Sequence, residues 1–401
     1  MGKPKIRFEG YSEDWEQRKL GDWGNFYYGR SCPKWSVTED ATIPCIRYGE
    51  LYTKFGAKID RVYSYTNMPP ENLRFSKGTE VLIPRVGEDP MDYNHCTWLS
   101  MQDVAIGEMI SVFNTDNNPL FTATMFNATL QNEFAMRVEG GSVTNLYFEK
   151  LKNIEISFPS IPEQEKIASY FENLDHLITL HQRKCDEIKT LKKYMLQKMF
   201  PQNGEKVPEI RFDGFTEDWE QRKLGELGEI LTGSTPSTSN SAYYSEDGIP
   251  WVTPTDINEL TISDTPRKLS EEGAKVGRVV PANTILCTCI ASIGKNALLT
   301  VKGSFNQQIN SLTPSAGNDA YFLLTESELW SNKMKRIAAS GTMQIVNKTE
   351  FSELDTLVPL TDEQKKIGSY FRNLDHLITL HQRKCNELKE IKKYMLQNMF
   401  V

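Results

Sequence analysis

A stretch of about forty residues that occurs twice limits the fold of this chain more than any other feature. Residues 161–200 return as residues 361–400, and 30 of the 40 positions are identical. Apolar side chains recur in both copies at spacings of three and four, with charged residues between them, which is the pattern of an amphipathic helix. Neither copy holds a Pro or Gly after Pro162 or Gly368, so each can form one helix of up to about 38 residues. Such a helix is roughly 57 Å long.

A helix of this length with a narrow apolar seam cannot bury itself inside a small globule, so the obvious partner of each copy is the other copy. The predicted helix–helix seam consists of Leu174, Ile178, His181, Cys185 and Ile188 in the first copy and Leu374, Ile378, His381, Cys385 and Leu388 in the second. Basic pairs at 183–184 and 192–193 recur at 383–384 and 392–393. They fit a solvated helix flank, or a contact with phosphate or with a partner subunit.

A second repeat precedes each long helix. Residues 6–21 (the first lead) return almost unchanged as residues 210–225 (the second lead). Each half of the chain thus consists of a lead, a variable block and a long helix, in that order. The expected division is 1–160 for the first lead and block, 161–200 for the first helix, 201–360 for the linker, second lead and second block, and 361–401 for the second helix. Residues before the first lead resemble the linker before the second, so the chain resembles a ring of two equal units cut open at one joint. Trp15 and Trp219 in the leads either pin them to a core or form a partner-docking surface.

Composition excludes some classes of protein. No run of 18 apolar residues exists, so we expect no transmembrane helix and no membrane partner, and the N-terminus lacks the apolar core of a signal peptide. The formal net charge of −7 gives no support to nucleic-acid binding, so a basic face would have to be made by folding. The seven cysteines are odd in number and include no Cys-x-x-Cys pair, which favours reduced, mostly buried thiols in a cytoplasmic protein over a disulfide framework or a zinc site.

The two variable blocks are predicted to be mainly β-structure, which gives an α+β fold. Short runs rich in Val, Ile, Tyr and Phe are separated by clusters of Gly, Pro, Asn and Asp. We expect strands at 81–85, 105–113, 284–290, 297–301 and 356–360, and a helix at 320–339.

No catalytic or metal motif stands out. The chain has neither the Gly-x-x-x-x-Gly-Lys-Ser/Thr loop that cradles phosphate nor the Gly-x-Gly-x-x-Gly fingerprint, so we expect a non-catalytic protein. His176 and His181, with their copies His376 and His381, raise the alternative of a metal site between the helices. Position 181 lies on the predicted seam, which favours packing or a hydrogen bond over ligation. Cys185 stands four residues further on, which keeps zinc open as an alternative.

Several short segments in a fixed order resemble the specificity subunit of type I restriction–modification systems, over essentially the whole chain. The second block carries most of this resemblance, in residues 248–256, 291–295, 305–308 and 340–348, followed by Phe351 and the Glu-Gln that opens the helix. The first block is a looser match through 43–47 and 140–145, and its middle, residues 85–129, departs from the pattern of the second block.

The resemblance implies two target recognition domains, each reading one half of a bipartite, asymmetric DNA site, with the two long helices packed antiparallel as the spacer. Such a pair of repeats would be related by a pseudo-two-fold axis, as in dimeric readers of paired half-sites. The implied partners are double-stranded DNA, two methyltransferase subunits and two translocase–nuclease subunits. S-adenosylmethionine, ATP and Mg would belong to those partners, with no cofactor in this chain. A nucleoid-associated protein of the bacterial cytoplasm is implied.

Direct reading of bases needs polar and basic side chains on loops that enter the grooves. In the first block the predicted DNA-binding residues are Arg30, Lys34, Arg47, Tyr48, Arg85, Asn94 and Asn145. In the second block they are Ser234, Thr235, Thr253, Thr255, Asp256, Ser292, Lys295, Asn306, Gln307, Gln308, Thr342, Gln344 and Lys348. The competing interpretation is a protein-interaction scaffold in which the duplicated helices hold two identical partners.

Overall fold

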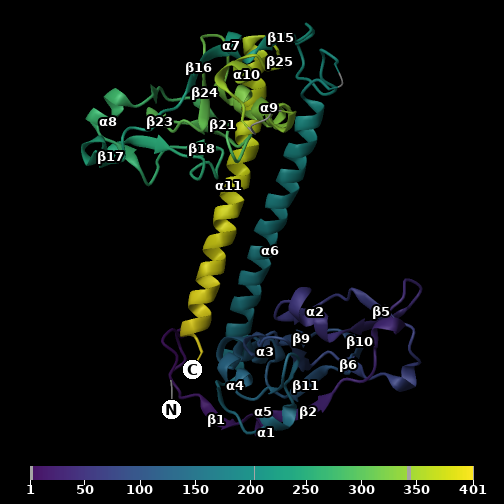
Figure 1. The fold of residues 1–401 in the computed structure, drawn as a ribbon. Coiled ribbons are helices and arrows are strands. Elements are labelled where there is room, and N and C mark those ends of the chain that lie inside the picture. Colours follow the sequence, from purple (N-terminus) through teal and green to yellow (C-terminus); the bar gives the residue numbers. More distant parts are fainter. Residues whose placement is uncertain (1–2, 203, 341–344, 401) are drawn as a thin grey trace. The chain divides into compact units, whose positions relative to one another are not determined.

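The computed structural model of this chain describes residues 3–202, 204–340 and 345–400 (Figure 1). The chain forms two compact units. Unit 1 comprises residues 1–182 and 383–401, and unit 2 comprises residues 183–382. The repeated stretches form α6 (Ile161–Lys198) and α11 (Thr361–Asn398), each of 38 residues. Each unit therefore contains one half of each long helix.

The two helix halves within each unit pack against each other in opposite directions. In unit 2, the Cys185 Sγ lies 3.9 Å from the Ile378 carbonyl oxygen, and Lys192, further along α6, pairs with Asp375, which is earlier in α11, at 2.9 Å. In unit 1, the Cys385 Sγ lies 4.0 Å from the Ile178 carbonyl oxygen. The predicted antiparallel pair of long helices is thus confirmed, and apolar seam residues join the main core of each unit. 

The ten predicted seam residues all lie at least partly inside the units. Five are buried, namely Leu174, Cys185, Leu374, Cys385 and Leu388, and five are half-buried, namely Ile178, His181, Ile188, Ile378 and His381. Several lysines of the basic pairs are held in ion pairs. Lys192 contacts Glu328 and Asp375 at 2.9 Å each, and Lys392 contacts Asp175 at 2.5 Å.

The recurring Glu-Gln near the start of each long helix ties the helix to its own unit. Glu163 accepts two hydrogen bonds from the Arg7 guanidinium at 2.7 and 2.8 Å, and Glu363 accepts the same pair from Arg211. Both carboxylates are almost fully buried. The sequence repeat is therefore also a repeat of buried charge pairs, each between a lead and a helix start.

The leads meet the helix ends in the same way in both units. The Ile210 N–H donates to the Lys198 carbonyl at 2.8 Å, and the Ile6 N–H donates to the Asn398 carbonyl at 2.9 Å. The likeness of the chain ends to the internal joint is thus present in the structure. Trp15 and Trp219 are buried, so they pin the leads to the cores.

Unit 1 is built on a five-stranded and a four-stranded sheet, with two smaller ones. The five-stranded sheet has the order β2 (Gly24–Tyr28), β11 (Ile110–Thr115), β7 (Glu80–Pro84), β9 (Thr97–Leu99) and β4 (Lys58–Ile59). The four-stranded sheet has the order β5 (Ser64–Thr66), β3 (Ile43–Ile46), β10 (Gln102–Ile106) and β6 (Phe75–Lys77). The smaller sheets are β12 (Glu139–Gly140), β13 (Thr144–Asn145) and β8 (Val86–Gly87), and β1 (Glu16–Lys19) with β14 (Glu155–Phe158).

Unit 2 repeats this topology strand for strand in its main sheets. Its five-stranded sheet has the order β16 (Gly228–Thr232), β24 (Ile309–Pro314), β21 (Thr284–Thr288), β22 (Asn296–Leu299) and β18 (Thr261–Ile262). Its four-stranded sheet has the order β19 (Lys268–Leu269), β17 (Tyr244–Val252), β23 (Gly303–Phe305) and β20 (Val279–Val280), and β15 (Glu220–Lys223) pairs with β25 (Asp355–Val358). The parallel pairs correspond as well, since β3–β10 matches β17–β23 and β4–β9 matches β18–β22.

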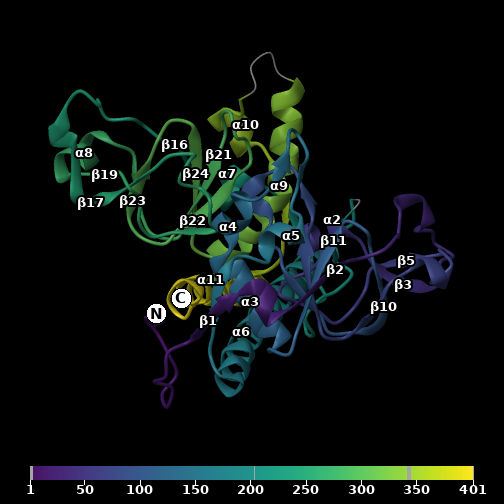
Figure 2. The ribbon, with the colours of Figure 1, turned by 90° about the horizontal axis from the view of Figure 1, so that it is seen from below.

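Short helices complete both units. Unit 1 has α1 (Leu20–Trp23), α2 (Tyr48–Thr53), α3 (Pro119–Thr129), α4 (Gln131–Ala135), α5 (Phe148–Leu151) and the 3-10 turns η1 (Lys34–Ser36), η2 (Pro70–Asn72) and η3 (Pro90–Asp92). Unit 2 has α7 (Leu224–Leu227), α8 (Glu271–Val276), α9 (Ala320–Ser340), α10 (Lys348–Ser352) and η4 (Ser241–Tyr243). In unit 2, Figure 2 shows the five-stranded sheet between α9 and α10 on one side and β17, β19, β23 and α8 on the other. The α+β prediction is confirmed.

In the first block, one local prediction was wrong and one helix was not foreseen. The run 105–113 is not one strand, because a turn at Gly107–Met109 separates β10 from β11. The prediction also missed α3, whose residues 120–126 are all buried. A helix that is buried all round lacks a polar face, so its sequence shows no helical periodicity.

Candidate nucleic-acid interface

Both units contain the same backbone junction, where the first strand of the five-stranded sheet ends beside a parallel strand pair. In unit 2, the Gly233 N–H donates to Ile309 and the Ser234 N–H donates to Phe305, at 3.0 and 2.9 Å. The Asn306 N–H donates to Val252 at 2.9 Å, which brings the end of β17 to the same place. A Cβ on Gly233 would lie 2.1 Å from the Asn306 carbonyl oxygen, so this close approach requires glycine.

Unit 1 makes the junction with equivalent bonds. The Gly29 N–H donates to Ile110 at 3.0 Å, the Arg30 N–H to Ile106 at 2.8 Å, and the Gly107 N–H to Ile46 at 2.9 Å. A Cβ on Gly29 would lie 2.1 Å from the Gly107 carbonyl oxygen. The two blocks differ through most of their sequence but share this set of backbone hydrogen bonds, which forms a common frame for their loops.

In unit 2, the junction brings together two groups of predicted residues from segments far apart in the chain. The Thr235 hydroxyl donates to the Gln307 side-chain oxygen, across the loop after β16 and the turn after β23. Within that turn, the Asn306 amide donates to Gln308 at 3.2 Å and accepts from the Gln308 N–H at 3.1 Å. The amides of this turn thus hold one another in fixed orientations.

The loop after β17 carries Thr253, Thr255 and Asp256. The Asp256 carboxylate accepts hydrogen bonds from the Thr253 N–H at 2.8 Å and from its hydroxyl at 2.6 Å. The hydroxyls of Thr253 and Thr255 lie 2.8 Å apart. Asp256 therefore shapes its own loop, which presents the two threonine side chains.

Three further predicted residues of unit 2, Ser292, Lys295 and Lys348, lie on segments that border Gln308. The Cys289 N–H donates to the Gln308 carbonyl at 2.8 Å and begins the loop that carries Ser292 and Lys295. The Cys289 carbonyl accepts from the Val346 N–H at 2.9 Å, which brings the start of α10, with Lys348, next to this loop. Thr342 and Gln344 lie outside the described residues.

In unit 1, the junction carries cations in place of neutral side chains. Arg30 and Arg47 follow the strands that end there, in the places of Ser234 and Thr253. Arg47 N–H donates to Glu50 at 2.9 Å, as the Thr253 N–H donates to Asp256. Lys34 lies in η1 of the loop after Arg30, and Tyr48 begins α2 directly after Arg47.

Arg85 and Asn145 also lie on this frame. The Arg85 N–H donates to the Met109 carbonyl and its own carbonyl accepts from the Leu146 N–H, which are the bonds that Cys289 makes in unit 2. The first block thus keeps the common frame through the region where its sequence departs from the second. The Arg85 guanidinium lies over the rings of Tyr28 and Tyr147, at 4.7 and 5.5 Å from their centres. Burial, together with a hydrogen bond to Glu149, raises the pKa of Tyr28 to about 12, so this ring stays neutral.

Asn94 does not lie on the frame. Its side-chain amide donates to the Asn127 carbonyl in α3 at 3.2 Å. This contact joins the segment after η3 to α3, so the Asn94 amide helps to hold the two elements together.

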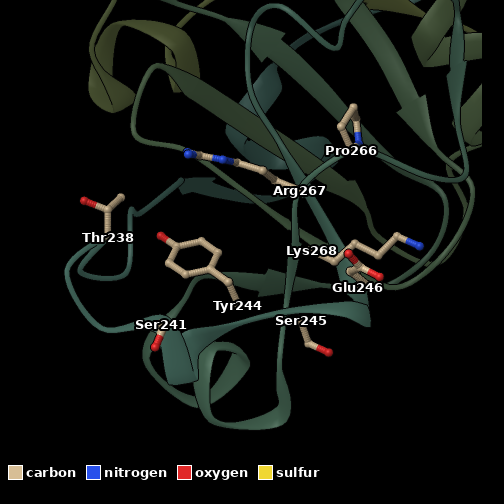
Figure 3. A pocket seen from close by; sticks show the side chains of 8 residues that line it. All are labelled: Thr238, Ser241, Tyr244, Ser245, Glu246, Pro266, Arg267 and Lys268. Atoms are coloured by element: carbon tan, nitrogen blue, oxygen red, sulfur yellow. The ribbon is translucent and has the colours of Figure 1, made fainter.

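Sequence reasoning missed two exposed arginines of unit 2 next to the junction. The Arg278 N–H donates to the Ser234 hydroxyl at 2.8 Å. Arg267 lines a hollow beside the same loop, together with residues such as Thr238 and Tyr244 (Figure 3). In the sequence, Arg267 and Arg278 follow Ser234 by 33 and 44 residues, and the pairing of the four-stranded sheet brings them beside its loop. No local pattern in the sequence reveals this.

The described part of the chain contains no cluster of three or more His, Cys, Asp or Glu side chains placed to hold a metal ion. All seven cysteines are buried and free. Among the described residues, no helix is both long and apolar enough to span a membrane. The structure thus offers polar and basic loops on a rigid frame as the candidate site.

Comparison with known proteins assigns a family to this chain. The model of the type I restriction modification DNA specificity domain matches residues 12–190 and again residues 216–390. The specificity subunit of the MjaIX type I restriction enzyme of Methanocaldococcus jannaschii is 29% identical over 191 residues, which are 46% of this chain and 44% of that protein. The specificity subunit of the HindI type I restriction enzyme of Haemophilus influenzae is 29% identical over 184 residues, 43% of this chain and 39% of that protein. The matches thus span less than half the length of each relative.

A solved structure shares the fold. The S subunit of a type I restriction–modification system from M. genitalium aligns over 100% of this chain and 99% of its own, with a TM-score of 0.69 and 14% sequence identity. The two matched segments of the family model correspond to the two copies of the repeat.

Proposed function

This chain belongs to the family of type I restriction–modification DNA specificity proteins, and from that premise we propose that it is the sequence-reading subunit of such a system. Each unit reads one half of a bipartite, asymmetric DNA site, and the paired long helices set the spacing between the halves. The chain directs adenine-N6 methylation, and restriction, that partner subunits carry out.

One observation carries this proposal. The two junctions share their backbone bonds, yet they present different side chains at matching places, with Arg30 and Arg47 in unit 1 where unit 2 has Ser234 and Thr253. A common frame with different side chains is what two readers of different base sequences require, because specificity depends on which donors and acceptors reach the base edges. If the unit were repeated only to stabilise the fold, the side chains at these matching places would not need to differ.

The repeated parts of the chain suit two copies of one partner. The leads and long helices are nearly identical in sequence, so a protein that binds one copy would also bind the other. We propose that two methyltransferase subunits bind there, and that two translocase–nuclease subunits complete the restriction assembly. S-adenosylmethionine, ATP and Mg belong to those partners, and this chain supplies no catalytic group. The proposed place of action is the bacterial cytoplasm, at the nucleoid, because the DNA lies there.

The acidic balance of the chain predicts weak DNA binding by the chain alone. With a net charge of −7, it needs partner subunits to supply more of the cations that neutralise phosphates. Addition of the cognate methyltransferase subunit should therefore raise the affinity for a cognate duplex strongly. Full sequence-specific binding by the lone chain at high salt would contradict this expectation.

A modification map tests the proposed function. The chain is expressed with its cognate methyltransferase subunit in a host without DNA methylation, and the genome is sequenced for N6-methyladenine. We expect methylated adenines on opposite strands of one split motif with a fixed gap. If a stable complex forms and no adenine is modified, the scaffold interpretation replaces this one.

A further inference from the structure

Unit 2 contains a hollow of about 410 Å³ that none of the predicted DNA-binding residues lines (Figure 3). Three segments form its walls: the loop after β16, the stretch from η4 into β17, and the residues that enter β19. The side chains that bear on its chemistry are Thr238, Ser241, Tyr244, Glu246, Arg267 and Lys268.

One wall of the hollow belongs to the junction loop itself. The Tyr244 hydroxyl donates to the Pro236 carbonyl at 2.7 Å, and its ring meets Trp251 edge-on with 6.0 Å between ring centres. The Trp251 indole N–H donates to the Ser234 carbonyl at 3.1 Å. The loop that carries Ser234 and Thr235 is thus fixed between the junction and the hollow, so a ligand at one lies beside the other.

The two cations that line the hollow differ in their partners. Lys268 pairs with Asp264 at 2.9 Å, and this hydrogen bond lowers the pKa of Asp264. Arg267 is exposed, and in the described part of the chain its guanidinium has no ion pair and no hydrogen bond. Figure 3 shows Arg267 extending toward the side where Thr238 and the Tyr244 hydroxyl lie, whereas Lys268 points the other way, beside Glu246.

Two hydroxyl groups that line the hollow are free to bind a ligand. Within the described residues, the hydroxyls of Thr238 and Ser241 make no hydrogen bond. The Tyr244 hydroxyl already donates its hydrogen bond to the Pro236 carbonyl oxygen. The planar guanidinium offers only donors, and each of the two hydroxyls can donate a hydrogen bond as well. This set suits an oxyanion such as a phosphate, which can accept a bidentate pair of hydrogen bonds from arginine.

We propose that Arg267, with Thr238 and Ser241, binds a phosphate of the DNA backbone in this hollow. This inference rests on the proposed function and assigns two different roles to residues of unit 2. Arg267 fixes the position of the duplex, and the neutral side chains of the junction, such as Thr235 and Gln307, read the bases. Phosphate contacts set register and carry no sequence information, while base-edge contacts provide the specificity. In unit 1, by contrast, the cations Arg30 and Arg47 stand on the junction itself.

The test measures how binding depends on salt. Wild type and Arg267→Ala, each as the full chain with its cognate methyltransferase subunit, are titrated with a duplex that holds the mapped motif and with a scrambled duplex. We expect Arg267→Ala to weaken both by a similar factor and to flatten the plot of log K against log salt by about one unit of slope. Arg267→Lys keeps the charge and should keep most of the slope, which separates lost charge from misfolding.

Two matched variants serve as controls. Lys268 lines the same hollow, but its charge is already paired with Asp264. Lys268→Ala should therefore leave the slope unchanged. Arg336→Ala removes an exposed arginine of α9, in the same unit but away from the hollow, and should also leave the slope unchanged.

The outcomes separate this inference from the proposed function. If the wild-type complex does not prefer the mapped motif, both fail. If it does, and Arg267→Ala leaves the slope unchanged, the phosphate site is wrong and the proposed function stands. If Arg267→Ala alters the base preference at one position of the motif, Arg267 reads a base and the assignment to phosphate is overturned.

Discussion

At the scale of single residues, one pair of contacting core positions differs in chemistry between the two units. Glu326 of α9 is 2% exposed; one of its oxygens accepts from the Thr356 hydroxyl, and the other has no hydrogen-bond partner. The Trp330 indole donates to the same hydroxyl at 3.0 Å. In unit 1, Met125 and Ile156 occupy the places of Glu326 and Thr356, since helices α3 and α9 are capped alike and β14 pairs as β25 does. A carboxyl group in unit 2 thus stands where unit 1 has an apolar side chain.

Because this carboxyl group is buried, we predict that unit 2 loses stability as the pH rises. Burial raises the pKa of Glu326 to about 8 from the usual 4.5, so the folded chain keeps a proton that the unfolded chain releases. Between these values the folded state binds more protons, so its stability falls with rising pH, by at most about 1.4 kcal/mol per pH unit. Urea unfolding from pH 5 to 8 should show a smaller decline for the double variant Glu326→Met with Thr356→Ile. If the double variant showed the same pH dependence as the wild type, Glu326 would not be a carboxyl group buried without a cationic partner.

The buried pairs Arg7–Glu163 and Arg211–Glu363 give a second prediction at this scale. Arg7→Ala leaves the fully buried Glu163 without its partner, and we expect a loss of about 3–5 kcal/mol in the free energy of unfolding. Arg18→Ala is the control, since it removes an exposed arginine paired with the exposed Glu16 and should cost no more than about 1 kcal/mol. Chemical denaturation measures both. Equal losses would mean that the bidentate pair is not buried in solution.

At the scale of elements, the repeated helices were predictable and the elements of the first block were less so. The spacing of Leu174 and its companions predicts α6 because the helix is half exposed, so its buried face shows in the sequence. In α3, burial extends from residue 120 to 126 without a break, and two of those residues are threonines. An apolar run of this kind reads equally well as a strand. The parallel pairs β3–β10 and β17–β23 join segments more than fifty residues apart, and no local pattern records such pairing.

The helix seam supplies a prediction for an element. Leu174 is 7% exposed in the core of unit 1, while Leu177, one turn further along the same helix, is 40% exposed. Leu174→Ala should lower the free energy of unfolding by about 2–4 kcal/mol because it leaves a cavity. Leu177→Ala should change it by no more than about 0.5 kcal/mol. Denaturant midpoints compare the two, and a larger loss for Leu177→Ala would place the packed face elsewhere.

At the scale of the whole molecule, the family and the two-unit plan followed from repeats and short motifs, whereas the candidate interface only partly did. Loop residues such as Thr235 and Gln307 were predictable because they stand in recognisable segments, and the structure brings them into contact. Arg267 was not predictable, because its place beside the junction depends on strand pairing. Asn94 lies apart from the junction and its amide holds α3, and polarity alone does not distinguish a side chain with such a role from one that faces a ligand.

The central claim is that each unit reads its own half of the site. The most direct measurement replaces the block from residue 24 to residue 159 with the corresponding block of another family member and repeats the N6-methyladenine map. The account predicts that one half of the split motif changes to a new sequence, while the other half stays the same. A change in both halves, or an unchanged motif, would contradict the claim that the units read the DNA independently.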